Sequence, residues 1–454
     1  MIHSINPTNN EIIASYKEHS ASEIEHILLE AENGFKDWKT VPFSERAKCM
    51  NTAAEQLILR KAEFSRMMVL EMGKTFAQAE SEVEKCAWVL RYYAENSEKF
   101  LEDEIIETDA QKSFVTFQPL GVILAVMPWN FPLWQVFRFA APTLMAGNAA
   151  ILKHASNVTG CALLIEDVFC KSGLPNNLFK ALITPGREVS KIITNPIIKA
   201  VSLTGSTAAG ISVATAAGSV LKKCVLELGG SDPYIVFGDA DIEKAAEFSV
   251  FSRLINSGQS CIAAKRFIIV EEVYSQFEEV FLEKMKSKKM GDPFDKGSDL
   301  GPQARVDLRD ELSEQVHRSV SNGARLLLGG IVPETSGAWY PPTVLSGVLP
   351  GNPAFDEEIF GPAAALIKAG NELKAIELAN MPSFGLGASI FTSDLQKGEH
   401  AAKYLVNAGS CFVNTFVKSD PRLPFGGINE SGYGRELSAY GIKEFVNIKT
   451  VFIK

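Results

Sequence analysis

The sequence predicts an α/β protein made of two doubly wound α/β units and a small β ribbon. At 454 residues the chain is longer than one hydrophobic core usually supports. Between residues 122 and 228, short apolar segments alternate with helical stretches, a pattern typical of a parallel sheet with helices on both faces. The alternation starts again after Gly230, which indicates a second unit of the same kind.

The N-terminal stretch is expected to be helical and to carry no chemistry. Ser22 and Glu25 form a capping-box pattern, and apolar residues follow it at helical spacing. A second helix is predicted to begin at Ser44, and a third to cover residues 80–102.

Two segments predict a β ribbon outside the α/β units. Residues 113–119 alternate like a strand and end at a proline, which favours an edge position. The tail, residues 444–453, is predicted to be a final strand that could join this ribbon.

The strands of the two α/β units are predicted from short apolar runs. In the first unit they are residues 122–126, 149–153, 179–183, 200–203 and 225–228. In the second unit they are residues 234–237, 267–270, 364–367, 387–391 and 411–414, with helices at 242–255 and 274–286.

Composition narrows the classes of function. With 46% hydrophobic and 22% charged residues, the chain resembles an ordinary soluble globular protein. No apolar run reaches the roughly 18 residues that span a bilayer, and residues 1–16 are too polar for a signal peptide, so we expect a cytoplasmic protein without a membrane partner. The net charge of −9 argues against a nucleic-acid partner.

The seven cysteines are odd in number, widely spaced and without a CxxC pair, so we expect neither a disulfide framework nor a metal site. Cys261 differs from the others in its neighbours. It follows the turn around Gly258, and the carboxylate of Glu227 lies upstream. This arrangement predicts covalent thiol chemistry with Glu227 as the base. A cysteine hydrolase is an alternative, but it needs a histidine base, and none of the six histidines lies in a matching motif.

A glycine-containing turn after a predicted strand provides a candidate phosphate site. Gly205-Ser206-Thr207 would present backbone N–H groups and a helix N-terminus to a pyrophosphate. Alone, such a turn is more often structural.

Taken together, seven motifs resemble the series found in the NAD(P)-dependent aldehyde dehydrogenases, in order and over essentially the whole chain. They are Pro128-Trp129-Asn130-Phe131-Pro132, Lys153, Gly205-Ser206-Thr207, Glu227-Leu228-Gly229-Gly230, Gly258-Gln259-Ser260-Cys261, Glu358-Ile359-Phe360-Gly361-Pro362 and Pro424-Phe425-Gly426-Gly427. The resemblance implies a dinucleotide-binding domain (1–111 and 120–228), a catalytic domain (229–436) and an oligomerisation ribbon (112–119 and 437–454) that forms dimers or tetramers.

The resemblance also implies catalytic roles. Cys261 would attack the aldehyde carbon, and the Asn130 amide with the Cys261 backbone N–H would stabilise the oxyanion. Glu227 would activate the water that hydrolyses the thioester. Glu436 matches a second carboxylate sometimes assigned to proton relay.

The cofactor implied is NADP or NAD. Many NAD-preferring relatives carry a glutamate three residues after the lysine, whereas this chain has Ser156, so we expect NADP to be accepted. The residues that match cofactor-binding positions are Met127, Trp129, Lys153, Ser156, Gly186, Gly205, Ser206, Leu228, Glu358 and Phe360.

For the substrate, Arg138 and Ser419 resemble the arginine and serine with which succinate-semialdehyde dehydrogenases bind the distal carboxylate. An arginine fork can bind both carboxylate oxygens. A second arginine of some relatives is replaced here by Ile255, and Arg253 or Lys265 is a candidate to compensate. The expected reaction is therefore oxidation of succinate semialdehyde to succinate. Alternatives are another carboxylated semialdehyde such as glutarate semialdehyde, general aliphatic aldehydes, transfer of the thioester to coenzyme A, or a catalytically silent relative.

Overall fold

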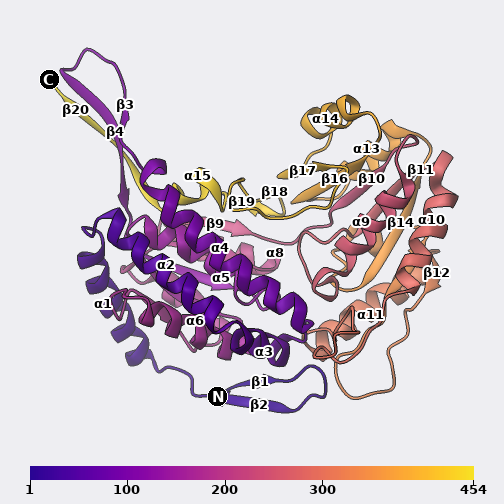
Figure 1. Cartoon of the computed structure of the whole chain (residues 1–454), viewed down its shortest axis with the longest axis horizontal. Helices are drawn as coiled ribbons and strands as arrows, with labels where there is room; N and C mark the ends of the chain where they lie inside the picture. The colour runs from indigo at the N-terminus through magenta and orange to yellow at the C-terminus, as the bar shows by residue number, and fades with distance from the viewer.

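The computed structural model describes all residues, Met1 to Lys454. Figure 1 shows two α/β units side by side, with a β ribbon projecting from one of them at the C-terminal end of the chain. The first unit has a six-stranded sheet in the order β19-β9-β8-β5-β6-β7, in which all neighbours but β19 and β9 run parallel. Its strands are β5 (Val122–Met127), β6 (Ala149–His154), β7 (Phe179–Ala181), β8 (Ile198–Thr204), β9 (Lys223–Glu227) and β19 (Gly432–Tyr433).

All five strands predicted for this unit are present. β7 is shorter than predicted because the backbone of Ile183 pairs with His19 instead of with β6. The strand β19 comes from far along the chain and returns to this sheet beside β9.

The first helix of this unit has a different N-cap from the predicted one. The capping box is formed by Ser20 and Glu23, not by Ser22 and Glu25, because Ser22 already lies in the first turn. A hairpin of β1 (Ile2–Ile5) and β2 (Ile12–Tyr16), which the sequence pattern missed, precedes this helix. The helices are α1 (Ala21–Trp38), α2 (Phe43–Leu59), α3 (Lys61–Met72), α4 (Phe76–Phe100), α5 (Trp134–Met145), α6 (Thr159–Lys171), α7 (Val189–Thr194) and α8 (Thr207–Gly218), with short 3-10 turns η1 (Ser156–Val158) and η2 (Gly186–Glu188).

The second unit is a seven-stranded sheet in the order β12-β13-β14-β11-β10-β16-β17, parallel except for β12. Along its central strands, successive side chains enter different cores. Tyr234 and Val236 belong to one apolar cluster, whereas Ile235 and Phe237 belong to the other. Both faces are therefore buried, which explains why these strands have continuous apolar sequences. The strands are β10 (Pro233–Val236), β11 (Arg266–Val270), β12 (Arg325–Leu328), β13 (Thr343–Ser346), β14 (Ala363–Ala369), β16 (Gly387–Phe391) and β17 (Ser410–Val413).

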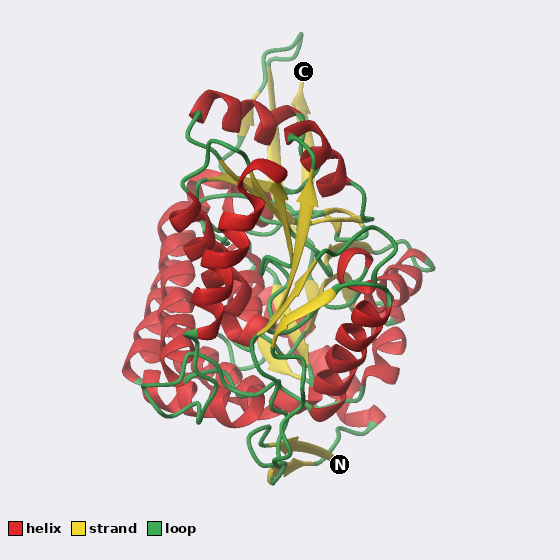
Figure 2. Ribbon diagram, turned by 90° about the vertical axis from the view of Figure 1, so that its right-hand side faces the viewer, coloured by secondary structure: helices red, strands yellow, loops and turns green.

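Helices cover both faces of this second sheet, as Figure 2 shows from the side. The predicted helices at 242–255 and 274–286 are present, whereas α11 to α14 were not predicted. The elements are α9 (Ile242–Leu254), η3 (Ile255–Gly258), α10 (Glu271–Lys286), α11 (Val306–Ser321), α12 (Pro353–Asp356), α13 (Glu372–Asn380) and α14 (Leu395–Tyr404), with a small pair of strands β15 (Phe384–Gly385) and β18 (Ile428–Asn429) and a last short helix α15 (Ser438–Ile442).

The ribbon contains β3 (Glu104–Ile105), β4 (Lys112–Pro119) and β20 (Val446–Ile453). The predicted pairing of the tail with residues 113–118 is confirmed, with register from Val446 opposite Pro119 to Ile453 opposite Lys112. The prediction that residues 113–119 form the edge is wrong, because β4 has β3 on one side and β20 on the other. The two edge strands are β20 and the two-residue β3. No helix in the chain has the length and apolarity that a membrane crossing requires.

Candidate active site

Three strand ends of the first sheet converge on one cavity. Strands β5, β8 and β9 run parallel, so the segments that follow them, around Asn130, Gly205 and Gly229, leave the same edge of the sheet. Such an edge is where ligands bind in open α/β sheets. The cavity there measures about 430 Å³ and also contains Cys261. Its lining includes eight residues that the sequence had singled out: Trp129, Asn130, Gly205, Ser206, Leu228, Cys261, Glu358 and Phe360.

The loop that carries Cys261 is a left-handed turn. Asn256, Ser257 and Gly258 have φ values of 56°, 54° and 77°. At Gly258 an added Cβ would overlap the backbone of Gly361, so only glycine fits. The two non-glycine residues cost about 1–3 kcal/mol each in such a conformation, a strain typical of functional sites. Asn256 is held by its side chain, which donates to the carbonyls of Asn130 (2.7 Å) and Gln259 (3.0 Å).

Arg253 and Lys265, the two candidates to compensate for the missing substrate arginine, both bind the backbone of this loop. Arg253 is fully buried and donates to the carbonyl of Gly258 at 2.6 Å. Lys265 is also buried, and its Nζ donates to the carbonyls of Ser260 (3.0 Å) and Cys261 (2.7 Å). Backbone carbonyls thus bind both cations, and Lys265 Nζ also lies 3.4 Å from a carboxylate oxygen of Glu358.

The environment of Cys261 favours the neutral thiol. The side chain is half-buried, and burial raises the thiol pKa to about 12, although the positive charges of Lys265 and Arg138 act in the opposite direction. The thiolate is the nucleophilic form, so the reaction needs a group that removes the proton.

Asn130 is positioned as an oxyanion donor. Its Nδ2 donates to the carbonyl of Gln259 at 3.0 Å, which leaves the second amide proton free. Gln135 fixes the orientation of the amide by donating to Asn130 Oδ1 at 3.0 Å. Sequence reasoning missed Gln135, although its position five residues after Asn130 would have allowed such a contact.

Glu227, at the end of β9, lies close to the cavity but does not line it. The carboxylate is 2% exposed, and neither oxygen has a hydrogen-bond partner. Its Oε1 packs against Gly426. Burial raises the pKa of Glu227 well above its usual value, and the negative charge of Glu436 adds to this. The carboxylate is therefore a strong base that no hydrogen bond holds in place.

Arg138, predicted to bind the distal carboxylate, lies beside Glu436 and Thr204. The guanidinium is 3% exposed and forms an ion pair with Glu436, while Nη2 contacts Thr204 Oγ1 at 3.3 Å. Nε and Nη2 thus have partners within the protein, while the positive charge still lowers the pKa of the Cys261 thiol. Ser419 is buried, and its hydroxyl accepts a hydrogen bond from Lys85 at 2.8 Å. Lys85 was not singled out from the sequence, because it lies in a helix without a motif.

The residues expected to hold the adenosine end of a dinucleotide line a neighbouring cavity of about 630 Å³. Lys153 and Ser156 both lie there, and burial lowers the pKa of Lys153, which has no ion-pair partner. A buried ammonium without a partner fits a phosphate or ribose ligand. Ser206, at the N-terminus of the helix α8, lines the cavity of Cys261, where the dipole of the helix favours a pyrophosphate. The residues therefore fit a dinucleotide.

Glu358 is fixed close to the nucleophile. One carboxylate oxygen accepts from the Gly230 N–H at 3.0 Å and lies 3.4 Å from Lys265 Nζ. Phe360 packs edge-to-face on Trp129, with ring centroids 5.8 Å apart. Both residues are thus ready to contact a nicotinamide ribose or ring.

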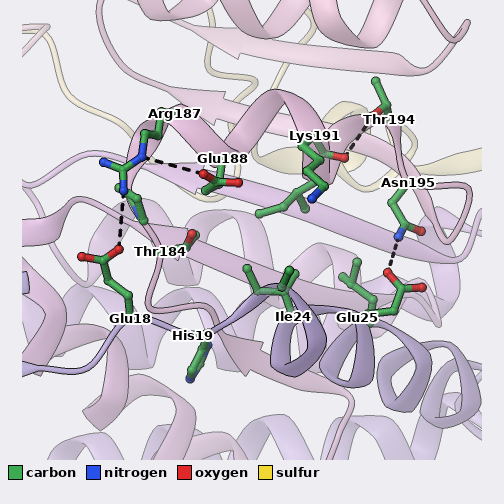
Figure 3. A pocket seen from close by; sticks show the side chains of 14 residues that line it. Glu18, His19, Ile24, Glu25, Thr184, Arg187, Glu188, Lys191, Thr194 and Asn195 are labelled. Carbon is green, nitrogen blue, oxygen red and sulfur yellow. Dashed lines mark hydrogen bonds and ion pairs between the residues drawn. The ribbon is translucent and has the colours of Figure 1, made fainter. Parts of the chain in front are cut away.

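Two expected cofactor residues lie elsewhere. Met127 is buried at the end of β5, and its carbonyl accepts from the Ala155 N–H. Gly186 follows Pro185 beside a third cavity, which lies between the first turns of α1 and residues 184–195. Figure 3 shows this cavity with Arg187 and Lys191 on one side and Glu18 and His19 on the other. Neither residue lines the two cavities described above. No cluster of three or more His, Cys, Asp or Glu side chains is arranged to hold a metal ion.

Comparison with known proteins agrees with this geometry. The aldehyde dehydrogenase family matches residues 1–451. A probable NADP(+) succinate-semialdehyde dehydrogenase of Synechocystis is 46% identical, over 100% of this chain and 99% of its own length. Succinate-semialdehyde dehydrogenase [NADP(+)] 1 of Mycobacterium tuberculosis is 44% identical, over 100% and 99%. The solved structure of succinic semialdehyde dehydrogenase from Streptococcus pyogenes with NADP+ superposes with a TM-score of 0.97 at 35% identity, covering 100% of both chains. Since the family matches residues 1–451 and these relatives are 44–46% identical over the full length, this chain belongs to the aldehyde dehydrogenase family.

Proposed function

We propose that the protein oxidises succinate semialdehyde to succinate with NADP+ or NAD+ through a thioester on Cys261. The observation that carries the proposal is the cavity that contains Cys261 together with Asn130, Ser206 and Glu358. The names of relatives 44–46% identical over the full length support the choice of substrate.

In the first half of the reaction, Cys261 Sγ forms a bond to the aldehyde carbon. The negative charge that develops on the aldehyde oxygen is stabilised by the free Asn130 amide proton and the Cys261 backbone N–H. When bound, the nicotinamide supplies the acceptor for the hydride of the resulting thiohemiacetal. Glu358 and Phe360 orient that end of the site, and the carbon left on Cys261 is an acyl thioester.

In the second half, water attacks the thioester carbon, the C–S bond breaks, and succinate leaves with the thiol restored. Glu227 takes the proton from this water. To do so, its side chain turns from Gly426 toward the cavity, which is inexpensive because neither carboxylate oxygen gives up a hydrogen bond.

A cofactor prediction follows from Ser156. The Ser156→Glu variant places a carboxylate beside Lys153 in the adenosine cavity, where it would repel a 2′-phosphate. We expect kcat/KM for NADP+ to fall by about 10-fold or more, while the value for NAD+ changes little. Steady-state rates with both cofactors measure this ratio, and the Ser156→Ala variant is the control for loss of the hydroxyl. An unchanged ratio would remove Ser156 from the cofactor site.

We also propose a functional division of the chain. Residues 1–111 and 120–228 bind the cofactor, and residues 229–436 carry the nucleophile. Residues 112–119 and 437–454 form the oligomerisation ribbon. Gly432 and Tyr433 nevertheless pair with the first sheet, so the two domains share an edge. A cytoplasmic location accords with seven unpaired cysteines, as expected in a reducing compartment.

Self-association is proposed to occur through β20, as a dimer or tetramer. This strand is the longer of the two edge strands of the ribbon, and Ile448 and Phe452 are 62% and 50% exposed on it. Open apolar edges pair with other strands. We expect the double variant Ile448→Asp/Phe452→Asp to sediment as smaller species than the wild type, whereas the matched Asn447→Asp variant should not. Identical sedimentation of all three would exclude this edge.

A further inference from the structure

The cavity around Lys153 and Ser156 gathers more cationic side chains than an uncharged ribose needs. It also contains His3 and Arg305, in a chain whose net charge is −9. Arg305 donates to Asp307 at 2.9 and 2.6 Å, whereas Lys153 has no ion-pair partner. The adenosine ribose of NAD carries only hydroxyl groups, whereas that of NADP also carries a phosphate. The excess of cationic groups therefore favours a ligand with this phosphate.

His3 reaches this cavity because side chains alternate along the strand β1. Ser4 is buried, whereas His3 and Ile5 are exposed, as expected for successive residues of a strand. The two exposed side chains both line the cavity. The ring of His3 is held from β2, where Ser15 Oγ lies 2.8 Å from Nδ1. This contact leaves Nε2 of the imidazole for a ligand.

A buried carboxylate fixes β1 beside Ser156. Glu71, on α3, has no exposed surface, and its Oε1 accepts a hydrogen bond from Ser4 Oγ at 2.6 Å. The same oxygen accepts from the backbone N–H of Gly160 at 2.8 Å. Gly160 lies in the first turn of α6, directly after the 3-10 turn η1 that begins at Ser156. His3, the neighbour of Ser4, is therefore held in a fixed place relative to Ser156.

A further donor in this cavity has no partner within the protein. Asn157 lines the cavity, and its Nδ2 is buried without a hydrogen bond. Leaving such a group unpaired costs about 1–3 kcal/mol, so a polar ligand here would be favoured. Arg305 lies just before α11 in the second unit, so donors reach the cavity from the hairpin, from the end of β6 and from the other unit. A phosphate, with three acceptor oxygens, fits donors that come from several directions.

We propose that His3 binds the 2′-phosphate of NADP together with Lys153 and Ser156, so that the N-terminal hairpin favours NADP over NAD. This inference rests on the proposed function and adds a residue that lies outside all of the cofactor motifs. The neutral imidazole offers one N–H donor when Ser15 donates to Nδ1, and the protonated imidazole adds a positive charge. Either form interacts with a phosphate more strongly than with a hydroxyl group.

The test is the His3→Gln variant, which keeps a polar side chain on β1 and removes the imidazole. We expect kcat/KM for NADP+ to fall by about 3- to 10-fold, mainly through KM, because one hydrogen bond to a ligand is of this strength. The value for NAD+ should remain within about twofold. A second measurement needs no turnover. By calorimetry, adenosine 2′,5′-bisphosphate should bind the variant more weakly by the same factor, whereas the binding of adenosine 5′-monophosphate should not change.

Two further variants sharpen the test. His3→Lys keeps a positive charge and should keep most of the preference for NADP+, whereas His26→Gln, at an exposed position on α1, should behave as the wild type. Wild-type binding of the bisphosphate by His3→Gln would overturn the role of His3, and the proposed function would stand if Ser156→Glu still weakens that binding. If neither variant weakens it, the cavity is not the adenosine site, and the cofactor assignment fails together with the role of His3.

Discussion

Replacing Cys261 by alanine is expected to abolish aldehyde-dependent NAD(P)H formation, with a loss on the order of 10⁴-fold or more. The reason is that the aldehyde must first become a thiohemiacetal, and the cavity contains no second thiol that could replace Cys261. The absorbance of the reduced cofactor, followed with excess aldehyde, measures the rate.

The matched control is Cys170→Ala, since this half-buried thiol on α6 lies outside the cavity. It should retain wild-type activity. Both variants should show an unchanged cofactor affinity by fluorescence titration, because Cys261 contributes no polar contact to the adenosine cavity. Persistent turnover in Cys261→Ala would mean that the covalent mechanism is wrong.

Most strands of the two sheets could be predicted because buried strands appear as apolar runs in the sequence, whereas β12, β13 and β19 were not predicted. In β10 and β11, alternate residues enter two different cores, so each strand appears as an unbroken apolar run. The hairpin of β1 and β2 has no such apolar run in its sequence. It has only half-buried or polar positions on much of its length, and its turn at Asn10 adopts a positive φ. Asn9-Asn10 was the one available signal.

The sequence predicts Cys261 as the nucleophile, Asn130 as the oxyanion donor and Glu227 as the base, and the structure places Cys261 and Asn130 in one cavity with Glu227 close to it. The residues around them depend on tertiary packing. Arg138 meets Glu436 only after the C-terminal segment returns to the first sheet, so its sequence position alone could not show this ion pair. Lys85 is one lysine of a long amphipathic helix, and only tertiary packing brings it to Ser419, 334 positions further along the chain. Arg253 resembled a surface charge of a helix but lies under the nucleophile loop.

Replacing Glu227 by glutamine is expected to slow steady-state turnover by about 10²- to 10⁴-fold while leaving the first half of the reaction in place. Glutamine keeps the shape of the side chain but cannot accept the proton of the attacking water. Rapid mixing with succinate semialdehyde should therefore show a burst of about one reduced cofactor per active site in the variant, followed by very slow turnover. The control is Glu279→Gln on the exposed face of α10, which should behave as the wild type.

The pH dependence gives the same experiment a second, independent readout. Burial, and then the negative charge of Glu436, raise the pKa of Glu227, so its carboxyl stays protonated to a higher pH than an exposed glutamate. Only the deprotonated form accepts a proton, so the wild-type rate should rise as the pH passes upward through this raised pKa. In Glu227→Gln that rise should disappear from the steady-state profile. If the variant instead loses the burst but hydrolyses a preformed thioester normally, Glu227 is the group that deprotonates Cys261. With a thiol pKa of about 12, Cys261 needs a base that removes its proton.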